Sequence, residues 1–416
     1  MANTVDSTAT SPNLKCIATT GDSFCRSIKK CEAAWTTKPR SHMRDDGSES
    51  NLFREAHFSK DGTTLITQNE DQSLRTFVLP SDLLDEAAQP HAMTAYSTGP
   101  SPTNMLSYAI YPGFDLSNTS STLVLSAAAE QPITLRNALD YDTVHAKYFH
   151  VNSLTEAYER VNSLAFSRDG SYFIAGGKDR IATFDCSRNA SGPTTNFRTA
   201  VSKKARKQYG APRGVGCAGI VNALAISADG MLAAGTTERE IALYDNEGRG
   251  ECITAFSVAQ LPGGYDSDYV KGTGITSLQW SPCGTYLVIA ERQSDSMQVY
   301  DVRNTLQWVS HLTGRKAETN QKLGIDMVPT ADGYEVWAGG TDGCVRMWNN
   351  PGHQYGEHTL DMEMKLHDGK LSRLETYSTV MLTQDDRSCL ERSVASWRRC
   401  ACHLLWPTIR DFRVHR

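Results

Sequence analysis

One short unit recurs along this chain, and it limits the possible fold more than any other feature. It is a polar turn ending in Gly, and its copies are Phe58-Ser59-Lys60-Asp61-Gly62, Phe166-Ser167-Arg168-Asp169-Gly170, Ile226-Ser227-Ala228-Asp229-Gly230, Trp280-Ser281-Pro282-Cys283-Gly284 and the weaker Val328-Pro329-Thr330-Ala331-Asp332-Gly333. Each copy leads into apolar runs, the last of which ends in an aromatic residue: Phe77, Phe184, Tyr244, Tyr300 or Trp348. A repeat of this kind indicates a repeat architecture.

The physical chemistry of the unit predicts its local structure. Asp-Gly is a hairpin signal, because Gly adopts the positive φ that the turn needs and Asp bonds to its own backbone. The flanking runs are rich in Val, Ile, Leu and aromatic residues and are too short for helices. Strand, turn, strand and a further aromatic strand make one four-stranded blade, and such blades stack radially into a β-propeller.

The spacing of the turns counts the blades. From Gly62 the intervals are 108, 60, 54 and 49 residues to the later turn glycines. The first interval is about twice the others, so a blade without the Asp-Gly turn is expected at 123–138. The fold class predicted is therefore all-β, a WD40-type β-propeller of seven-bladed architecture in which six blades are readable and the last is doubtful.

Three regions follow from this pattern. We expect a mobile N-terminal tail at 1–50, the propeller at 51–350 and an atypical segment at 351–416. No Gly occurs from Lys370 to Arg416, and no strand-turn-strand pattern is visible there. Two interpretations stay open: an unusual helical or disordered tail, or a coding sequence that departs from the authentic one near Gln384, so that the last blade is degenerate or lost.

Composition excludes several classes of protein. The hydrophobic fraction of 39% and the net charge of −5 are ordinary for a soluble domain. No apolar run is long enough for a membrane helix, and no secretory signal is visible. The 11 cysteines show no framework spacing, which indicates reduced thiols in the nucleus or cytosol.

A basic stretch between the third and fourth predicted blades is the strongest charge feature. No Asp or Glu occurs from Cys186 to Ala228, and the bases concentrate at Lys203, Lys204, Arg206, Lys207 and Arg213, with Tyr209 among them. Such a loop favours binding to RNA, because basic side chains that neutralise phosphates release counterions and an aromatic ring can stack on a nucleobase. The alternatives are a solvated loop or part of a nuclear import signal.

Two weaker sets of charged residues remain. Glu291, Arg292 and Arg303 flank the closing strand of blade five and are candidates for contact with RNA or a partner, because Arg reads phosphate or carboxylate with two hydrogen bonds. The alternative for them is an ion pair or hydrogen bond within the blade. We expect a purely structural role, bonding the turn backbone, for Asp71, Asp179 and Asp342.

Catalytic and cofactor motifs are missing from the sequence. It has no Gly-rich phosphate loop, no Gly-x-Ser-x-Gly elbow and no His-Glu-x-x-His. The spacing of Cys400-Ala401-Cys402-His403 is not that of a zinc pair. We therefore predict no enzymatic activity, no metal, no cofactor and no small-molecule substrate.

Several stretches in their order resemble the telomerase Cajal body protein 1 family of WD-repeat proteins, over about 300 residues. They are Asn51-Leu52-Phe53-Arg54, Leu74-Arg75-Thr76-Phe77, Glu130-Gln131-Pro132-Ile133-Thr134-Leu135-Arg136-Asn137-Ala138, Glu159-Arg160-Val161-Asn162-Ser163, Gly219-Ile220-Val221-Asn222-Ala223, Tyr300-Asp301-Val302-Arg303 and Thr319-Asn320-Gln321-Lys322 with Asp326. The blade-two signature of the family ends in Trp-Asp-Ala, whereas this chain has Arg136-Asn137-Ala138, which puts partner contacts at that place in doubt.

The resemblance implies a nuclear scaffold associated with RNA. Animal members bind small Cajal body RNAs and telomerase RNA, and fungal members are linked to splicing. We therefore expect a scaffold of small nuclear or Cajal-body-type ribonucleoprotein particles (telomerase RNP or spliceosomal snRNP), acting in the nucleus and bound to RNA or to RNA-bound proteins. The alternative is a generic WD40 adaptor for a protein complex, such as a ubiquitin ligase or a chromatin assembly, located in the nucleus or also in the cytoplasm.

Overall fold

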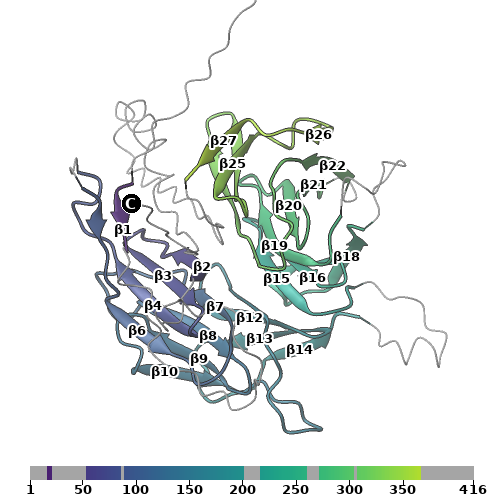
Figure 1. Ribbon diagram of the computed structural model, residues 1–416. Helices are drawn as coiled ribbons and strands as arrows, with labels where there is room; N and C mark the ends of the chain where they lie inside the picture. The colour runs from purple at the N-terminus through teal and green to yellow at the C-terminus, as the bar shows by residue number, and fades with distance from the viewer. Residues whose placement is uncertain are drawn as a thin grey trace, which may run out of the picture.

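The computed structural model describes residues 16–20, 53–85, 89–200, 216–259, 271–303 and 307–366. These residues form β-strands and one short 3₁₀ helix, η2 (Asn246–Gly248). Six sheets of four or five strands follow one another around a central axis, and the first strand of each sheet lies nearest the centre (Figure 1). The predicted all-β propeller is confirmed, and the described residues contain six blades.

Each blade is an antiparallel sheet whose main strands are consecutive in the chain. Blades one to three consist of β2 (Phe53–Phe58), β3 (Thr64–Asn69), β4 (Ser73–Val78), β6 (Ser97–Pro100); β7 (Met105–Ile110), β8 (Leu123–Ala128), β9 (Ile133–Asn137), β10 (Val144–Tyr148); and β11 (Ser163–Phe166), β12 (Tyr172–Gly177), β13 (Arg180–Asp185), β14 (Thr195–Arg198). The blade expected at 123–138, without an Asp-Gly turn, is present as blade two.

Blades four to six repeat the same order of strands. They consist of β15 (Val221–Ile226), β16 (Leu232–Thr236), β17 (Glu240–Tyr244), β18 (Cys252–Ser257); β19 (Ile275–Trp280), β20 (Tyr286–Glu291), β21 (Met297–Asp301), β22 (Gln307–Leu312); and β23 (Ile325–Thr330), β24 (Gly333–Gly339), β25 (Cys344–Asn349), β27 (Met362–Lys365). Blade six thus continues past residue 350, and residues 367–416 lie outside the described part of the chain.

The alternation of strand direction defines two faces of the ring. The hairpins between first and second strands and the connections between third and fourth strands lie at one end, here the lower face. The tight turns between second and third strands, and the connections from one blade to the next, lie at the other end, here the upper face. Any loop between β14 and β15 therefore begins and ends on the upper face.

The recurring Ser-x-Asp-Gly unit forms the lower-face hairpins. The buried Ser59 and Ser167 hydroxyls accept hydrogen bonds from the backbone N–H of Thr64 at 3.0 Å and Tyr172 at 3.1 Å, at the start of the second strand. The same hydroxyls donate to the Asp of the unit, at 2.5 Å and 2.7 Å. The turn glycine of blade three has φ = 72°, a conformation that side chains with a Cβ rarely adopt.

Connections on the lower face also join neighbouring blades. The connection in blade six contains β26 (Gly356–His358), which pairs in parallel with β22 of blade five. In blade one the matching connection contains β5 (His91–Ala92), which pairs in parallel with β1 (Ala18–Thr19). By this repetition, β1 has the place of an outer strand preceding blade one.

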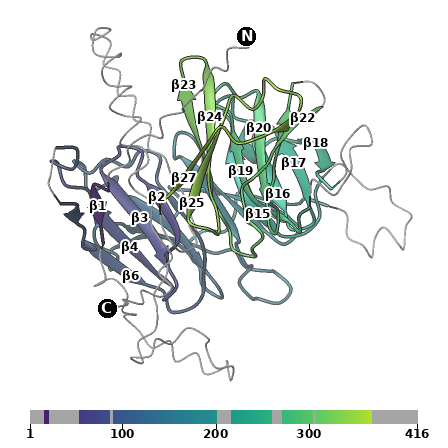
Figure 2. The same cartoon turned by 45° about the horizontal axis from the view of Figure 1, so that its top comes forward.

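Blades six and one are also linked directly by an ion pair. Figure 2 shows the strands of blade one and of blade six from a second direction. The Lys322 ammonium, in the segment before β23, lies 2.8 Å from the carboxylate of Glu55 on β2. Because Lys322 belongs to the last described blade and Glu55 to the first, this ion pair joins the two ends of the described ring.

Candidate functional site

The basic segment predicted to contact RNA has described flanks, although its own residues do not belong to the described part of the chain. Lys203, Lys204, Arg206, Lys207, Tyr209 and Arg213 all fall in 201–215. The flanks are Thr199 and Gly216, and a Cβ placed on Gly216 would collide with the Thr199 carbonyl. The segment therefore leaves and re-enters the upper face at a single place, between β14 and β15.

Two carboxylates hold this place together. The Asp179 carbonyl accepts from the Thr199 N–H at 3.0 Å, and the Asp179 carboxylate accepts from the Gly219 N–H at 2.6 Å. The Glu240 carboxylate accepts from the Ala218 N–H at 2.7 Å. Asp179 has φ = 53°, the left-handed region that Asp tolerates better than most residues. Asp179 thus anchors both flanks of the basic segment, and its carboxylate binds Gly219 rather than the backbone of its own turn.

The other two turn aspartates bind buried arginines. Asp71 receives two hydrogen bonds from Arg75, at 3.0 Å and 2.5 Å, and Arg75 is only 3% exposed. Asp342 receives two from Arg346, at 3.1 Å and 2.6 Å, and Arg346 is fully buried. Burial raises the pKa of each carboxyl, but the arginine and turn hydrogen bonds outweigh it, so both pKa values lie below the ordinary one.

The structure separates the second predicted set of charged residues. Glu291, at the end of β20, is buried and accepts from Arg239 at 2.6 Å and 2.9 Å, which is an ion pair between blades four and five. Arg292 lies in the upper-face turn, and its Nε atom is buried without a hydrogen-bond partner in the described structure. Arg303 lies on the lower face, at the other end of β21, and pairs with Asp301 at 2.9 Å.

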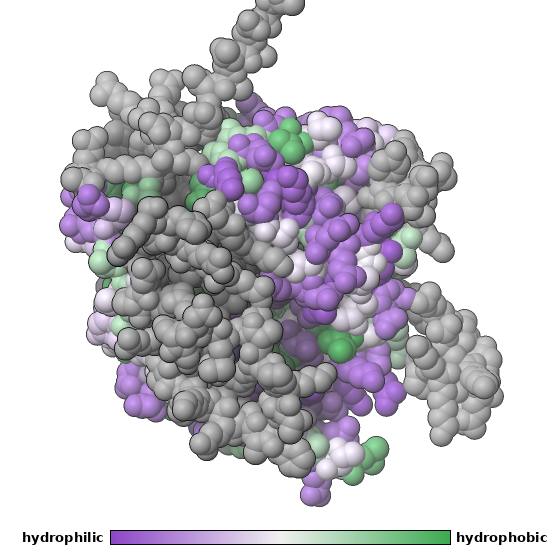
Figure 3. All heavy atoms as spheres, in the orientation of Figure 1, coloured by the Kyte–Doolittle hydropathy of each residue, from purple (hydrophilic) through white to green (hydrophobic). Residues whose placement is uncertain are grey.

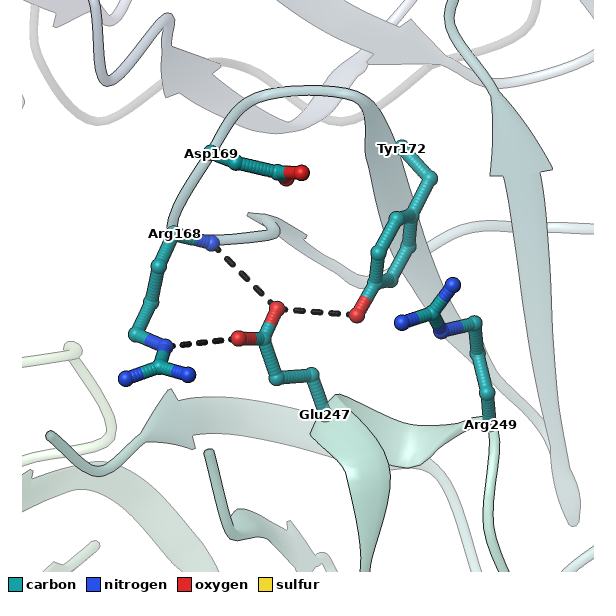
Figure 4. Close-up of a pocket in the computed structure, with 5 residues that line it drawn as sticks. All are labelled: Arg168, Asp169, Tyr172, Glu247 and Arg249. Carbon is teal, nitrogen blue, oxygen red and sulfur yellow. Dashed lines mark hydrogen bonds and ion pairs between the residues drawn. The ribbon is translucent and has the colours of Figure 1, made fainter. Parts of the chain in front are cut away.

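A pocket of about 380 Å³ opens on the lower face between blades three and four (Figure 4). Its lining residues are Arg168, Asp169, Tyr172, Glu247 and Arg249. The Glu247 carboxylate accepts from Arg168 Nε at 2.6 Å and from the Tyr172 hydroxyl at 2.8 Å, while the Arg249 guanidinium lies 4.0 Å above the Tyr172 ring. Figure 4 shows the two arginines on opposite sides of the Tyr172 hydroxyl.

Arg168 and Glu247 form an ion pair in this pocket. Burial raises the pKa of Glu247, but the hydrogen bonds from Arg168 and Tyr172 lower it by more. The pKa of Glu247 therefore lies below its ordinary value, and the carboxylate accepts the ion pair with Arg168. Burial and the bond to Glu247 raise the pKa of Tyr172, which keeps its hydroxyl protonated. The arrangement joins two blades. The Ser-Arg-Asp-Gly turn marks Arg168 in the sequence, but nothing local indicates Glu247 as its partner.

The described residues include no group of three or more side chains that are suited to hold a metal ion. No helix among them is long and apolar enough to cross a membrane. The face of the molecule in Figure 3 is mainly hydrophilic where its residues are described, with small, scattered hydrophobic areas.

These features define a β-propeller scaffold built from WD-type repeats, and comparison with known proteins agrees. Residues 149–183 match the model of the WD domain, G-beta repeat. This segment runs from the end of blade two into the third strand of blade three, and includes the Ser-Arg-Asp-Gly hairpin.

Longer similarities define the family. The chain is 31% identical to "Guanine nucleotide-binding protein negative regulator 1" of Schizosaccharomyces pombe over 307 residues, which cover 72% of this chain and 71% of that protein. It is 26% identical to human "Telomerase Cajal body protein 1" over 308 residues, 73% of this chain and 50% of the human protein. The Drosophila melanogaster homologue is 25% identical over 301 residues, 70% and 50% of the two chains.

The chain belongs to the telomerase Cajal body protein 1 family of WD-repeat proteins. The match spans about half the length of the animal relatives and most of the length of the fission yeast relative.

Proposed function

We propose that this protein is a non-catalytic WD-repeat scaffold of small nuclear or Cajal-body-type ribonucleoprotein particles. It works in the nucleus and binds RNA, or proteins already bound to RNA, through its upper face. The names of the animal relatives support this assignment, because they connect the family with telomerase and Cajal bodies.

The observation that carries the proposal is that both flanks of the basic segment are anchored by hydrogen bonds. Asp179 binds Thr199 and Gly219, and Glu240 binds Ala218, so both described flanks of the segment that contains Lys203, Lys204, Arg206 and Lys207 are fixed on the upper face. Fixed flanks reduce the conformational entropy that is lost when the basic side chains bind phosphates. Arg292, whose Nε has no partner within the described residues, extends the proposed contact surface to blade five.

Salt dependence tests this proposal. Changing Lys203, Lys204, Arg206 and Lys207 to Glu removes four cations, so the slope of log affinity against log salt should fall by about 3 for a single-stranded RNA. Crosslinking and sequencing of bound RNA from the native source identifies the ligand. We expect small nuclear or Cajal-body-type RNAs, lost in the four-Glu variant.

A matched control uses exposed basic residues of the lower face. Lys60→Glu with Arg188→Glu removes two cations from lower-face loops, and it is compared with Lys203→Glu plus Lys204→Glu. The lower-face pair should leave RNA binding unchanged. Equal losses in the two double variants, or a bound library like background, would contradict direct RNA binding by the basic segment.

The second candidate is an adaptor for a protein complex, such as a ubiquitin ligase or a chromatin assembly. The similarity to a fission yeast protein named as a negative regulator of a guanine nucleotide-binding protein favours it, since that name implies a protein partner. Partner capture that survives high salt and the four-Glu variant would support the adaptor over the RNA scaffold.

A further inference from the structure

One pair of side chains recurs at the contacts between blades. The outer strand of one blade supplies an aromatic residue, and the third strand of the next blade supplies another. The three aromatic pairs, with ring-centroid separations of 6.1, 5.4 and 4.9 Å, are Tyr148–Phe184, Phe197–Tyr244 and Phe256–Tyr300. In the fourth such contact, between blades five and six, Leu312 and Trp348 pack in one cluster.

Strand register identifies the matching positions between blades one and two. Gly99 lies opposite Leu74, as Phe197 lies opposite Ile181 and Phe256 opposite Ile241. Arg136 lies three residues after Ile133, as Phe184 lies three after Ile181 and Tyr244 three after Ile241, and these isoleucines pair with the outer strands of their blades. Arg136 is opposite the buried Val124 on the second strand, the place that Phe184 and Tyr244 have opposite Phe173 and Leu232. At this one contact both members of the recurring pair are therefore replaced, by Gly99 and Arg136.

Tyr141, from the lower-face connection of blade two, occupies part of the space. A Cβ placed on Gly99 would lie only 2.5 Å from Tyr141 Cγ, so the Tyr141 ring takes the space of that side chain. The Tyr141 hydroxyl bonds to Thr76 Oγ1 at 2.9 Å. The replacement is incomplete, because a groove of about 100 Å³ remains between β6 and the strands of blade two. That volume is room for about three water molecules, and so for one small ion.

The lining of this groove is cationic. Arg136 and Lys147 line it, and none of its lining residues is Asp or Glu; the others include Ser101, Gln131, Thr134, Pro100, Pro102 and Pro132. Arg136 Nε and Ser101 Oγ are buried with no hydrogen-bond partner among the described residues. Buried donors without partners are rare in folded proteins, and an absent ligand is one cause.

We propose that the groove between blades one and two binds the phosphate of a phosphorylated serine or threonine on a partner protein. The guanidinium of Arg136 and the ammonium of Lys147 together carry the charge that balances a phosphomonoester of −1.5 to about −2. Arg136 Nε and Ser101 Oγ supply donors for the phosphate oxygens.

The dimensions and lining of the groove favour a protein ligand over RNA. It holds one anion, whereas an RNA strand needs a row of cations along successive phosphates. Its aromatic residue, Tyr141, is only 4% exposed, so its ring is closed to a nucleobase. The prolines that line the groove, Pro100, Pro102 and Pro132, instead offer an apolar surface to the residues beside a phosphorylated side chain.

Nuclear magnetic resonance of the arginine side chains tests the proposal on the full chain. With ¹⁵N-labelled arginine, the Nε–Hε signal of Arg136 is assigned as the one missing from Arg136→Lys. The probes are N-acetylphosphoserine amide, N-acetylserine amide and uridylyl-uridine, a phosphodiester. We expect a saturable shift of the Arg136 signal with the phosphoserine probe alone.

Two results would overturn the proposal. One is a phosphoserine-induced shift of the Arg136 signal that is no larger than the shift of the exposed Arg303 signal, or that does not saturate. The other is an equal shift with uridylyl-uridine, which would assign the groove to nucleic acid.

A surface variant keeps the test independent of folding. Lys147 is exposed, so Lys147→Gln should leave the unfolding transition unchanged while weakening phosphoserine binding about two- to fivefold. Lys178→Gln, an exposed upper-face lysine of blade three that does not line the groove, is the matched control and should bind as the unchanged protein does. Equal affinities in the Lys147 and Lys178 variants would exclude Lys147 from the site.

Discussion

The carboxylate of Asp179 accepts a 2.6 Å hydrogen bond from the backbone N–H of Gly219, across forty residues of chain. Asp179 lies in the upper-face turn of blade three, and Gly219 lies just before the first strand of blade four. The bond therefore fixes the re-entry of the chain after the basic segment, while the Asp179 carbonyl fixes its exit at Thr199.

Replacing Asp179 should loosen the base of the basic segment. Asp179→Ala removes the acceptor and places Ala at φ = 53°, so we expect a loss of about 1–2 kcal/mol in the free energy of unfolding. Asp179→Asn keeps an acceptor oxygen and tolerates that conformation, and should lose much less. Denaturant unfolding measures both. Equal losses in the two variants would show that charge, rather than the hydrogen bond and the turn, is what matters.

The buried guanidinium of Arg346 should matter far more than the exposed one of Arg303. Arg346 is held by Asp342 and Glu363, each at 2.6 Å. Arg346→Met leaves Asp342 with only the Lys316 ammonium, 3.4 Å away, and removes the cation that Glu363 binds. We expect a loss of about 2–3 kcal/mol, moderated because both carboxylates are partly exposed. Arg303→Met breaks a surface pair and should leave unfolding unchanged. Similar transitions for both variants would contradict this account.

Burial of His150 should make stability depend on pH. Burial lowers the pKa of His150 from its ordinary 6.5, since both ring nitrogens lie in the interior without hydrogen-bond partners in the described structure. The unfolded chain then takes up a proton more readily than the folded one, so stability is full above about pH 6.5 and falls as the pH drops below it. His150→Phe should flatten this fall in thermal unfolding between pH 7 and pH 5. An unchanged slope would point to other groups.

Two glycines with different surroundings give a matched test of packing between blades. Gly99→Ala would bring its Cβ to 2.5 Å from Tyr141 Cγ and should cost about 1–3 kcal/mol in overpacking. At Gly192 the nearest atom to such a Cβ, the Phe149 carbonyl oxygen, is 3.6 Å away, so Gly192→Ala should be neutral or slightly stabilising. Chemical denaturation of both variants decides; a Gly99→Ala protein as stable as the parent would mean that Tyr141 moves freely.

The fold was predictable because its signals are local. The Ser hydroxyl and the turn glycine act within five residues, so Ser59 and Ser167 mark hairpins that the structure contains. The spacing of the turns also located blade two, although it lacks an Asp-Gly turn.

The partners of the charged residues were not predictable in the same way. Asp71 and Asp342 bind arginines four residues away, a contact that sequence spacing allows. Glu291 instead binds Arg239 from the preceding blade, fifty-two residues away, and Glu247 binds Arg168 at a separation of seventy-nine. No periodicity in the sequence encodes which charged side chain pairs with which across a blade contact.

The sequence by itself determined the repeat, the all-β blades and the places of their turns, because strand pattern and turn chemistry depend on neighbouring residues. Only the tertiary structure decided that Gly99 and Arg136 hold the two positions of one blade contact at which three other contacts have an aromatic pair. It also decided that Arg292 and Arg303 lie on opposite faces. Those relations depend on strand register and on how one blade stacks on the next, which bring together residues far apart in the chain.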